Sequence, residues 1–184
     1  MTQQNNQNKI RMRKRLFLLI LAFISLCQMY AVERTKLNFN GGWLLKVGDF
    51  PGAEQANYKD AGWKQITLPR AFNEKEAFKV SIQHLSDTIM WYRKHFHIQE
   101  VGDRKYFIEF EGVRFGADIW LNGKKVGYTE NGVMASGFDL TPYIIKGENV
   151  IAVRVDNFWN YRERTSGHRF QWNDKNFNAN YGGI

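Results

Sequence analysis

Two histidines, His95 and His97, lie two positions apart in a segment where apolar and polar residues alternate. On a β-strand, this spacing places both imidazoles on one face. Two such imidazoles can bind zinc if a third ligand comes from elsewhere in the chain, but His84 and His168 lie far away in sequence and lack ligand spacing. A partly exposed histidine pair on a sheet explains the pattern without a metal. We favour that interpretation and leave the metal assignment open.

Glu109 and Glu111 show the same spacing of two, which places their carboxylates roughly 7 Å apart on one strand face. Two carboxylates at that separation can hydrolyse a glycosidic bond with inversion, because a water molecule fits between them. A solvated sheet face accounts for the same residues, and we favour it. Glu74 and Glu76 lie in a predicted loop, and no neighbouring residue in the sequence would tune the acidity of their carboxyl groups for catalysis. We therefore assign no catalytic residue in this chain.

The region after residue 157 combines aromatic rings with many amides and charges. Sugars bind by stacking their C–H faces on aromatic rings and by hydrogen bonding to amides and carboxylates, so this composition suits saccharide recognition. The alternative is that the rings anchor a long loop to the rest of the protein. The aromatic residues are Phe158, Trp159, Tyr161, Phe170, Trp172, Phe177 and Tyr181.

Short alternating segments predict the elements that position these residues. The period of two over 91–98, 105–111, 116–122 and 149–156 predicts strands with one buried face each. Asn122-Gly123 predicts a tight hairpin, and we expect turns at 139–142 and 146–149. No long helical periodicity follows residue 32. The sequence therefore predicts an all-β fold, an antiparallel β-sandwich.

The first 31 residues predict a signal peptide. Five basic residues precede an apolar run over 16–26, and Ala31 supplies a small residue for cleavage. An uncleaved anchor and a lipoprotein modified at Cys27 are the alternatives, although Leu26 is bulky for a lipoprotein site. We expect an exported protein, periplasmic or extracellular, with residues 32–184 as its domain and no membrane contact after cleavage.

Removing the leader changes the composition. The whole chain has 26 Lys and Arg against 18 Asp and Glu, but the leader holds five of the basic residues and no acidic ones. The remaining excess of three charges does not support a nucleic-acid partner. Cys27 is the only cysteine, so the domain has no disulfide, thiol catalysis or cysteine metal site.

Six motifs in series carry a family resemblance. Together they resemble the N-terminal sugar-binding domain of glycoside hydrolase family 2, the family of bacterial β-galactosidases and β-glucuronidases. The resemblance covers roughly residues 37–184, and 180–184 is similar to the point where that domain's last loop enters its final strand. The motifs lie at 91–94, 110–113, 117–123, 138–141, 147–150 and 153–157.

This resemblance implies a jelly-roll-like, galactose-binding-domain-like sandwich. In the family, an immunoglobulin-like domain and a (β/α)₈ barrel follow, and the barrel carries both carboxylates of a retaining mechanism. The sequence stops abruptly after Ile184, so we expect a truncated chain that lacks its last strand and these partner domains. Alone, it is expected to hydrolyse nothing.

The resemblance also singles out Asp174. In the family, a loop of this domain delivers an acidic residue to the sugar, and in β-galactosidases that residue can join a sodium site. Trp172-Asn173-Asp174 is similar to the pattern that carries it, so these three residues are the expected substrate contacts. They favour a β-galactoside over a glucuronide. The alternative is a loop aspartate that caps its own backbone.

Three functions remain open at this point. The chain is the accessory domain of an exported glycosidase, a freestanding carbohydrate-binding module, or an adhesion domain that shares only the fold. The bare ending at Ile184 argues against the module, because the sheet would keep an unpaired edge. The Asp174 segment argues against the adhesion domain.

Overall fold

The computed structural model describes residues 11–17, 34–71, 88–130, 132, 134–158, 161–169 and 182–184. The chain divides into two units, Met1–Leu37 and Asn38–Ile184. In the first unit, residues 11–17 form a short helix, and most of the predicted signal peptide lies outside the described residues. None of the helical residues described here forms a span long and apolar enough to cross a membrane.

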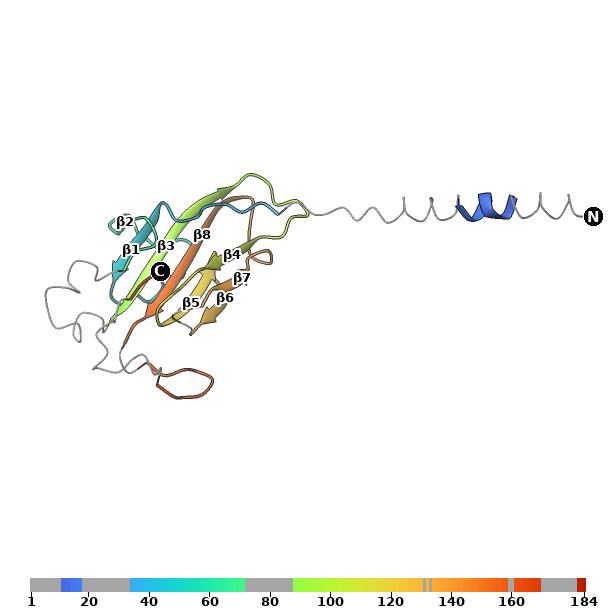
Figure 1. Cartoon of the computed structure of the whole chain (residues 1–184). Helices are drawn as coiled ribbons and strands as arrows, with labels where there is room; N and C mark the ends of the chain where they lie inside the picture. Colours follow the sequence, from blue (N-terminus) through green and yellow to red (C-terminus); the bar gives the residue numbers. More distant parts are fainter. Residues whose placement is uncertain are drawn as a thin grey trace, which may run out of the picture. The chain divides into compact units, whose positions relative to one another are not determined.

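The described residues of the second unit form eight strands in two antiparallel sheets (Figure 1). The larger sheet has the order β2-β1-β3-β8-β5-β6, and the smaller one pairs β4 with β7. The strands are β1 (Trp43–Val47), β2 (Lys64–Ile66), β3 (Ile89–Ile98), β4 (Phe107–Phe110), β5 (Gly116–Leu121), β6 (Lys124–Thr129), β7 (Ser136–Asp139) and β8 (Gly147–Asp156). The predicted antiparallel all-β architecture is confirmed.

The four predicted strands are β3, β4, β5 and β8, and the residues predicted to share a buried face do so. The prediction of a single buried face is wrong for β5 and β8, whose second face is also largely buried. On β5, for example, Ile119 and Leu121 are fully buried in the core between the sheets, whereas Trp120 lies on the other face. β3 and β8 form the centre of the larger sheet and pair over ten residues, from Ile89 with Asp156 to Ile98 with Gly147. The predicted turn at 146–149 is therefore wrong for its last three residues, which already pair with β3.

The hairpin predicted at Asn122-Gly123 is confirmed. β5 ends at Leu121 and β6 begins at Lys124, so two residues connect them. Asn122 has φ 53° and Gly123 has φ 78°, the left-handed values that a two-residue hairpin turn requires. The turn after β7 is also confirmed, because the Thr141 amide donates to the Asp139 carboxylate at 2.8 Å.

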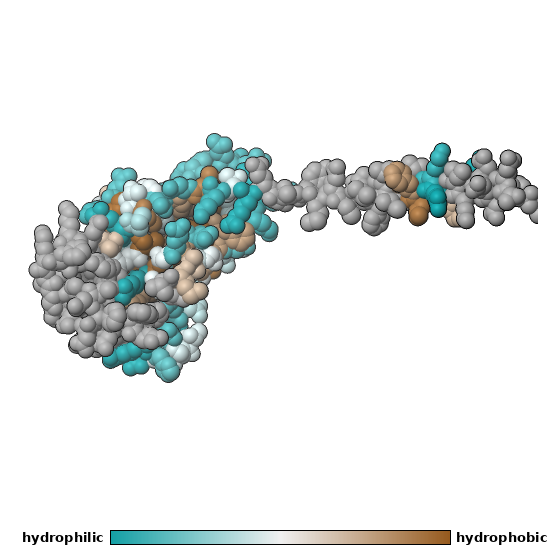
Figure 2. Space-filling view, viewed as in Figure 1, coloured by the Kyte–Doolittle hydropathy of each residue, from teal (hydrophilic) through white to brown (hydrophobic). Residues whose placement is uncertain are grey.

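The larger sheet is covered on both faces. Its inner face and the smaller sheet enclose the main core, to which Trp43, Tyr92 and Val153 contribute. On the outer face, the segment 49–63 covers Trp91 and Ala152 with apolar side chains such as Trp63. On the side seen in Figure 2, hydrophilic residues occupy most of the coloured surface of this unit. Burial on both faces gives the central strands their stability, since apolar area removed from water stabilises the fold.

Candidate functional site

The predicted substrate contacts Trp172, Asn173 and Asp174 lie outside the described residues, within the segment 170–181. The structure does describe the residues on either side of that segment. They are the hairpin 161–169, which precedes it, and the last three residues, 182–184, which follow it. We take these two flanks as the candidate functional site.

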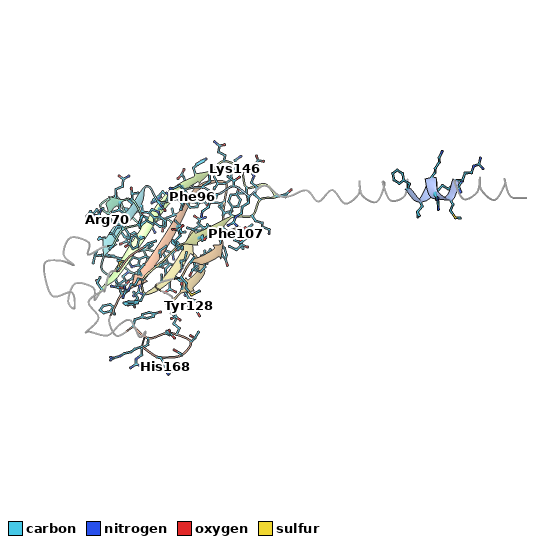
Figure 3. All side chains as sticks on the ribbon, in the orientation of Figure 1. Arg70, Phe96, Phe107, Tyr128, Lys146 and His168 are labelled. Carbon is cyan, nitrogen blue, oxygen red and sulfur yellow. The ribbon has the colours of Figure 1, made fainter. Side chains whose placement is uncertain are left out.

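The 161–169 hairpin projects from the sandwich as the orange-red loop in Figure 1. Its backbone closes on itself: the Glu163 amide donates to the His168 carbonyl at 2.9 Å, and the Gly167 amide donates to the Glu163 carbonyl at 2.8 Å. Arg162 also donates from Nη1 to the Gly167 carbonyl at 2.9 Å. Figure 3 shows His168 on the far side of this hairpin from the sheets. The hairpin is thus a defined but exposed element.

Asp118 attaches this hairpin to the larger sheet. Arg164 donates from Nη1 and Nη2 to the two oxygens of Asp118, at 2.8 and 2.6 Å, and Lys125 Nζ lies 2.7 Å from the same carboxylate. The Arg164 guanidinium also lies over the Tyr128 ring, 4.9 Å from its centroid. Burial alone raises the pKa of Asp118, but the hydrogen bonds from Arg164 and Lys125 outweigh burial and hold that pKa below its ordinary value. Asp118 is therefore ionised at neutral pH.

Glu130 provides a second attachment. Its Oε1 accepts a hydrogen bond from the Tyr161 hydroxyl at 2.6 Å and another from the Arg164 amide at 2.8 Å. Burial and the bond to Glu130 raise the pKa of Tyr161, so its hydroxyl keeps its proton and stays a donor. The phenol packs against Gly116, where a Cβ would meet ring atoms at 2.3 Å. Residue 116 therefore has to be glycine for Tyr161 to dock.

The second flank lies beside the first. Gly183 forms antiparallel bridges with both Ala71 and Arg114, and the Arg114 amide donates to the Gly183 carbonyl at 3.1 Å. Ile184 packs against the main core. Arg114 and Gly116 are two positions apart in the chain, so the two flanks of segment 170–181 are attached next to each other where β5 begins.

The histidine and glutamate pairs considered for chemistry, His95 with His97 and Glu109 with Glu111, lie elsewhere, on β3 and at the end of β4. Glu74, Glu76 and His84 lie outside the described residues. His95 Nε2 lies 2.8 Å from Asp60 Oδ2, and His97 Nδ1 lies 2.8 Å from Glu148 Oε1. Among the described residues, no three His, Cys, Asp or Glu side chains gather as metal ligands. Glu109 and Glu111 are exposed, as predicted for a solvated sheet face.

A buried ion pair stands beside His95, and the sequence patterns gave no sign of it. Arg93 is completely buried, although strand alternation places it on the outer face. It donates from Nε to Asp60 Oδ2 at 2.7 Å and from Nη1 to the carbonyls of Ala53 and Gln55. This pair fixes the segment 49–63 over the outer face of the larger sheet.

The comparison with protein families decides the assignment. The model of the glycosyl hydrolase 2 galactose-binding domain-like family matches residues 36–182, nearly the whole second unit. The chain belongs to this family. Within it, the match includes the 161–169 hairpin and the segment 170–181.

Some of the proteins to which this chain is similar are named β-glucuronidases, and others are named β-galactosidases. A β-glucuronidase of Formosa agariphila is 37% identical over 167 residues, which are 83% of this chain and 16% of that protein. A β-galactosidase of Bacteroides ovatus is 33% identical over 132 residues, which are 67% of this chain and 16% of that protein. The chain thus spans about one sixth of the length of these curated relatives.

Solved structures agree with the family assignment. A β-glucuronidase from glycoside hydrolase family 2 superposes with a TM-score of 0.65 at 33% identity, and the match covers 82% of this chain and 17% of that one. A β-glycosidase from Bacteroides vulgatus superposes with a TM-score of 0.55 at 34% identity, covering 65% of this chain and 17% of that one. The relatives are longer proteins in which this fold forms one part.

Proposed function

We propose that this chain is the N-terminal, sugar-binding and scaffold part of an exported family 2 glycosidase, which hydrolyses O-glycosyl bonds in carbohydrate metabolism. The family match over 36–182 carries this proposal. The relatives named as glycosidases are about six times longer, which supports further domains in the same enzyme. These are the immunoglobulin-like domain and the barrel.

The catalytic carboxylates belong to the barrel in this proposal. The exposure of Glu109 and Glu111 supports a purely accessory role for the residues described here. Retaining hydrolysis needs two carboxylates about 5 Å apart, one as nucleophile and one as acid and base. By itself, the 184-residue chain is expected to release no product from an aryl glycoside.

The segment 170–181 supplies the substrate contact. Asp174 accepts hydrogen bonds from sugar hydroxyls, and Trp172 and Asn173 complete the contact. Because carboxylate oxygen also suits a hard cation, Asp174 is a candidate ligand for sodium in the longer enzyme. The adjacent attachment of both flanks supports this role, since it fixes where the segment leaves and rejoins the fold.

A β-galactoside is the substrate that we propose, on the strength of Trp172-Asn173-Asp174. A β-glucuronide is the second candidate, because the relative with 37% identity is named a β-glucuronidase. The two sugars differ at C6, where the glucuronide carries a carboxylate and the galactoside a hydroxymethyl group. The freestanding carbohydrate-binding module is the alternative that needs no longer enzyme.

One experiment separates these proposals. The open reading frame that contains this chain is expressed in full, and the product is assayed on aryl β-galactoside and aryl β-glucuronide, with the 184-residue chain assayed alongside. We expect hydrolysis of the galactoside by the full product and none by the chain alone. Turnover of the glucuronide alone would reassign the sugar. Tight saccharide binding by the chain without any catalytic product would favour the module.

Export is tested separately. Residues 1–31 are proposed to be removed on secretion, which places the enzyme in the periplasm or outside the cell. N-terminal sequencing of the secreted protein is expected to begin at or near Val32. Recovery of an intact leader in the membrane fraction would indicate an anchor instead.

A further inference from the structure

The 161–169 hairpin is held to the sheet by charges rather than by an apolar face. Arg162, Arg164 and all of 165–169 are exposed, and Tyr161 is the only buried residue of the hairpin. An element with so little buried apolar area is ordinarily at the low-stability end of a protein. Apart from the packing of the Tyr161 ring against Gly116, its position must therefore come from its polar attachments.

Two acidic residues of the neighbouring sheet region supply those attachments. Asp118 on β5 holds Arg164 through two parallel hydrogen bonds. Glu130, directly after β6, holds both the Tyr161 hydroxyl and the Arg164 amide. Paired hydrogen bonds between a guanidinium and a carboxylate fix orientation as well as distance. Together the two carboxylates restrain the side chain and the backbone of Arg164.

We propose that Asp118 and Glu130 are positioning residues for sugar recognition. They fix the hairpin, and with it the point and direction from which the chain enters segment 170–181. This inference rests on the proposed function, because it concerns the segment to which the sugar contact is assigned. The proposal adds Asp118 and Glu130 to that function. Neither residue is proposed to contact the sugar, and both lie 44 or more positions before Asp174.

The attachment of residues 182–184 makes the restraint by Asp118 and Glu130 effective. Gly183 is bridged to Arg114, beside the Gly116 that receives the Tyr161 ring. With one flank fixed by backbone pairing, movement of the segment's entry point depends on the hairpin alone. A small misplacement of binding groups lowers the rate of an enzyme strongly, because reacting groups must be held in a narrow geometry.

The positional part of the inference is tested on the 184-residue chain by hydrogen exchange with mass spectrometry. The variants are Asp118→Asn, Glu130→Gln and the double variant. Exchange of the hairpin amides of 163–168 is expected to rise about tenfold or more, whereas exchange over Val150–Val155 of β8 stays unchanged. The matched control is Asp49→Asn, which removes a comparable bond to Arg154 on the same sheet and should leave the hairpin unchanged.

The functional part is tested on the full-length product of the reading frame. Asp118→Asn and Arg164→Gln are each expected to lower kcat/KM for the preferred aryl glycoside about tenfold, as loss of a charge-assisted bond predicts. If Asp118 and Arg164 act through the bond between them, the variant that combines Asp118→Asn with Arg164→Gln has the same kcat/KM as either single variant. Arg164→Lys keeps the charge but not the paired bonds and is expected to recover part of the loss. Arg164 lies on the exposed hairpin, and Lys125 still pairs with Asp118 on the sheet when Arg164 is replaced.

The outcomes separate the two proposals. Unchanged hydrogen exchange of the hairpin in the double variant of Asp118 and Glu130 overturns the positioning role. Increased exchange together with an unchanged kcat/KM of the active enzyme also overturns it. Fully additive losses in the Asp118 and Arg164 variants also overturn it. An unmodified full-length product that hydrolyses no glycoside overturns the proposed function, and the positioning role with it.

Discussion

The ring of Tyr161 lies against the backbone of Gly116, with no space for a side chain between them. A Cβ on residue 116 would come within 2.3 Å of Tyr161 Cζ and Oη. Tyr161 is 9% exposed, and its hydroxyl bonds to Glu130. We predict that Gly116→Ala displaces Tyr161 and lowers the free energy of unfolding by about 1–3 kcal/mol, the usual cost of overpacking. Urea denaturation measures this loss.

Gly62→Ala is the matched control for that prediction, because no atom lies within 4 Å of a Cβ built there. Hydrogen exchange should show that Gly116→Ala opens the 161–169 hairpin first. Equal stability of the Gly116 and Gly62 variants would contradict the close packing of Tyr161.

The Arg93–Asp60 pair provides a second prediction. Asp60→Asn leaves Arg93, which is fully buried, without its carboxylate. Removing one partner of a buried ion pair costs about 3–5 kcal/mol, because the other charge stays buried without compensation. Guanidinium denaturation at pH 7 should show a loss of this size. The half-exposed pair of Asp49 and Arg154 is the comparison, and Asp49→Asn should cost about 1 kcal/mol or less.

Low pH should destabilise the domain through the protonation of Asp60. Burial raises the pKa of Asp60, but the hydrogen bonds from Arg93 and His95 outweigh burial and leave its pKa below the ordinary 3.8. A carboxyl group with a lowered folded-state pKa stabilises the fold above the unfolded-state value and loses that contribution as pH falls below it. The free energy of unfolding should therefore fall as pH drops below about 4. In Asp60→Asn this fall should be smaller, and an equally steep fall in both proteins would contradict the assignment.

Asp174 carries the prediction for substrate binding. In the full-length product, Asp174→Asn is expected to lower kcat/KM for the preferred aryl glycoside by about 10- to 100-fold, since hydrogen bonds to a charged group contribute about 1.5–3 kcal/mol. Asp103→Asn, in an exposed turn, is the control. Full activity of the Asp174 variant would remove this residue from the sugar contact.

Strand prediction succeeded where one face of a strand is buried and the other alternates with it. β4 shows this pattern, with Ile108 and Phe110 buried and the residue before each of them exposed. β5 and β8 also lie where predicted, although both faces of each are largely buried. β1 was not predicted because Leu44 packs under the outer cover while Trp43 and Leu45 enter the main core, so its sequence does not alternate. β2 is only three residues long, and β7 contains Ser136 and Gly137, so neither carries a strong strand pattern.

Contacts between distant residues are what the sequence patterns did not reveal. Alternation places Arg93 on the outer face of β3, but only the tertiary structure shows that the segment 49–63 covers that face and buries Arg93. Asp118 and Arg164 are 46 positions apart and belong to no common motif. Such pairs depend on how the strands are ordered in the sheet, and local periodicity carries no information about that order.

The adjacent attachment of the two flanks also bears on how such domains diversify. Extra length in a flexible connection costs little, because closure entropy grows by only about 0.6 kcal/mol for each doubling of its length. We expect the number of residues between 169 and 182 to change at little cost to the sandwich. Grafting this stretch from one family member onto another offers a route by which evolution, or an engineer, can alter sugar preference without rebuilding the scaffold.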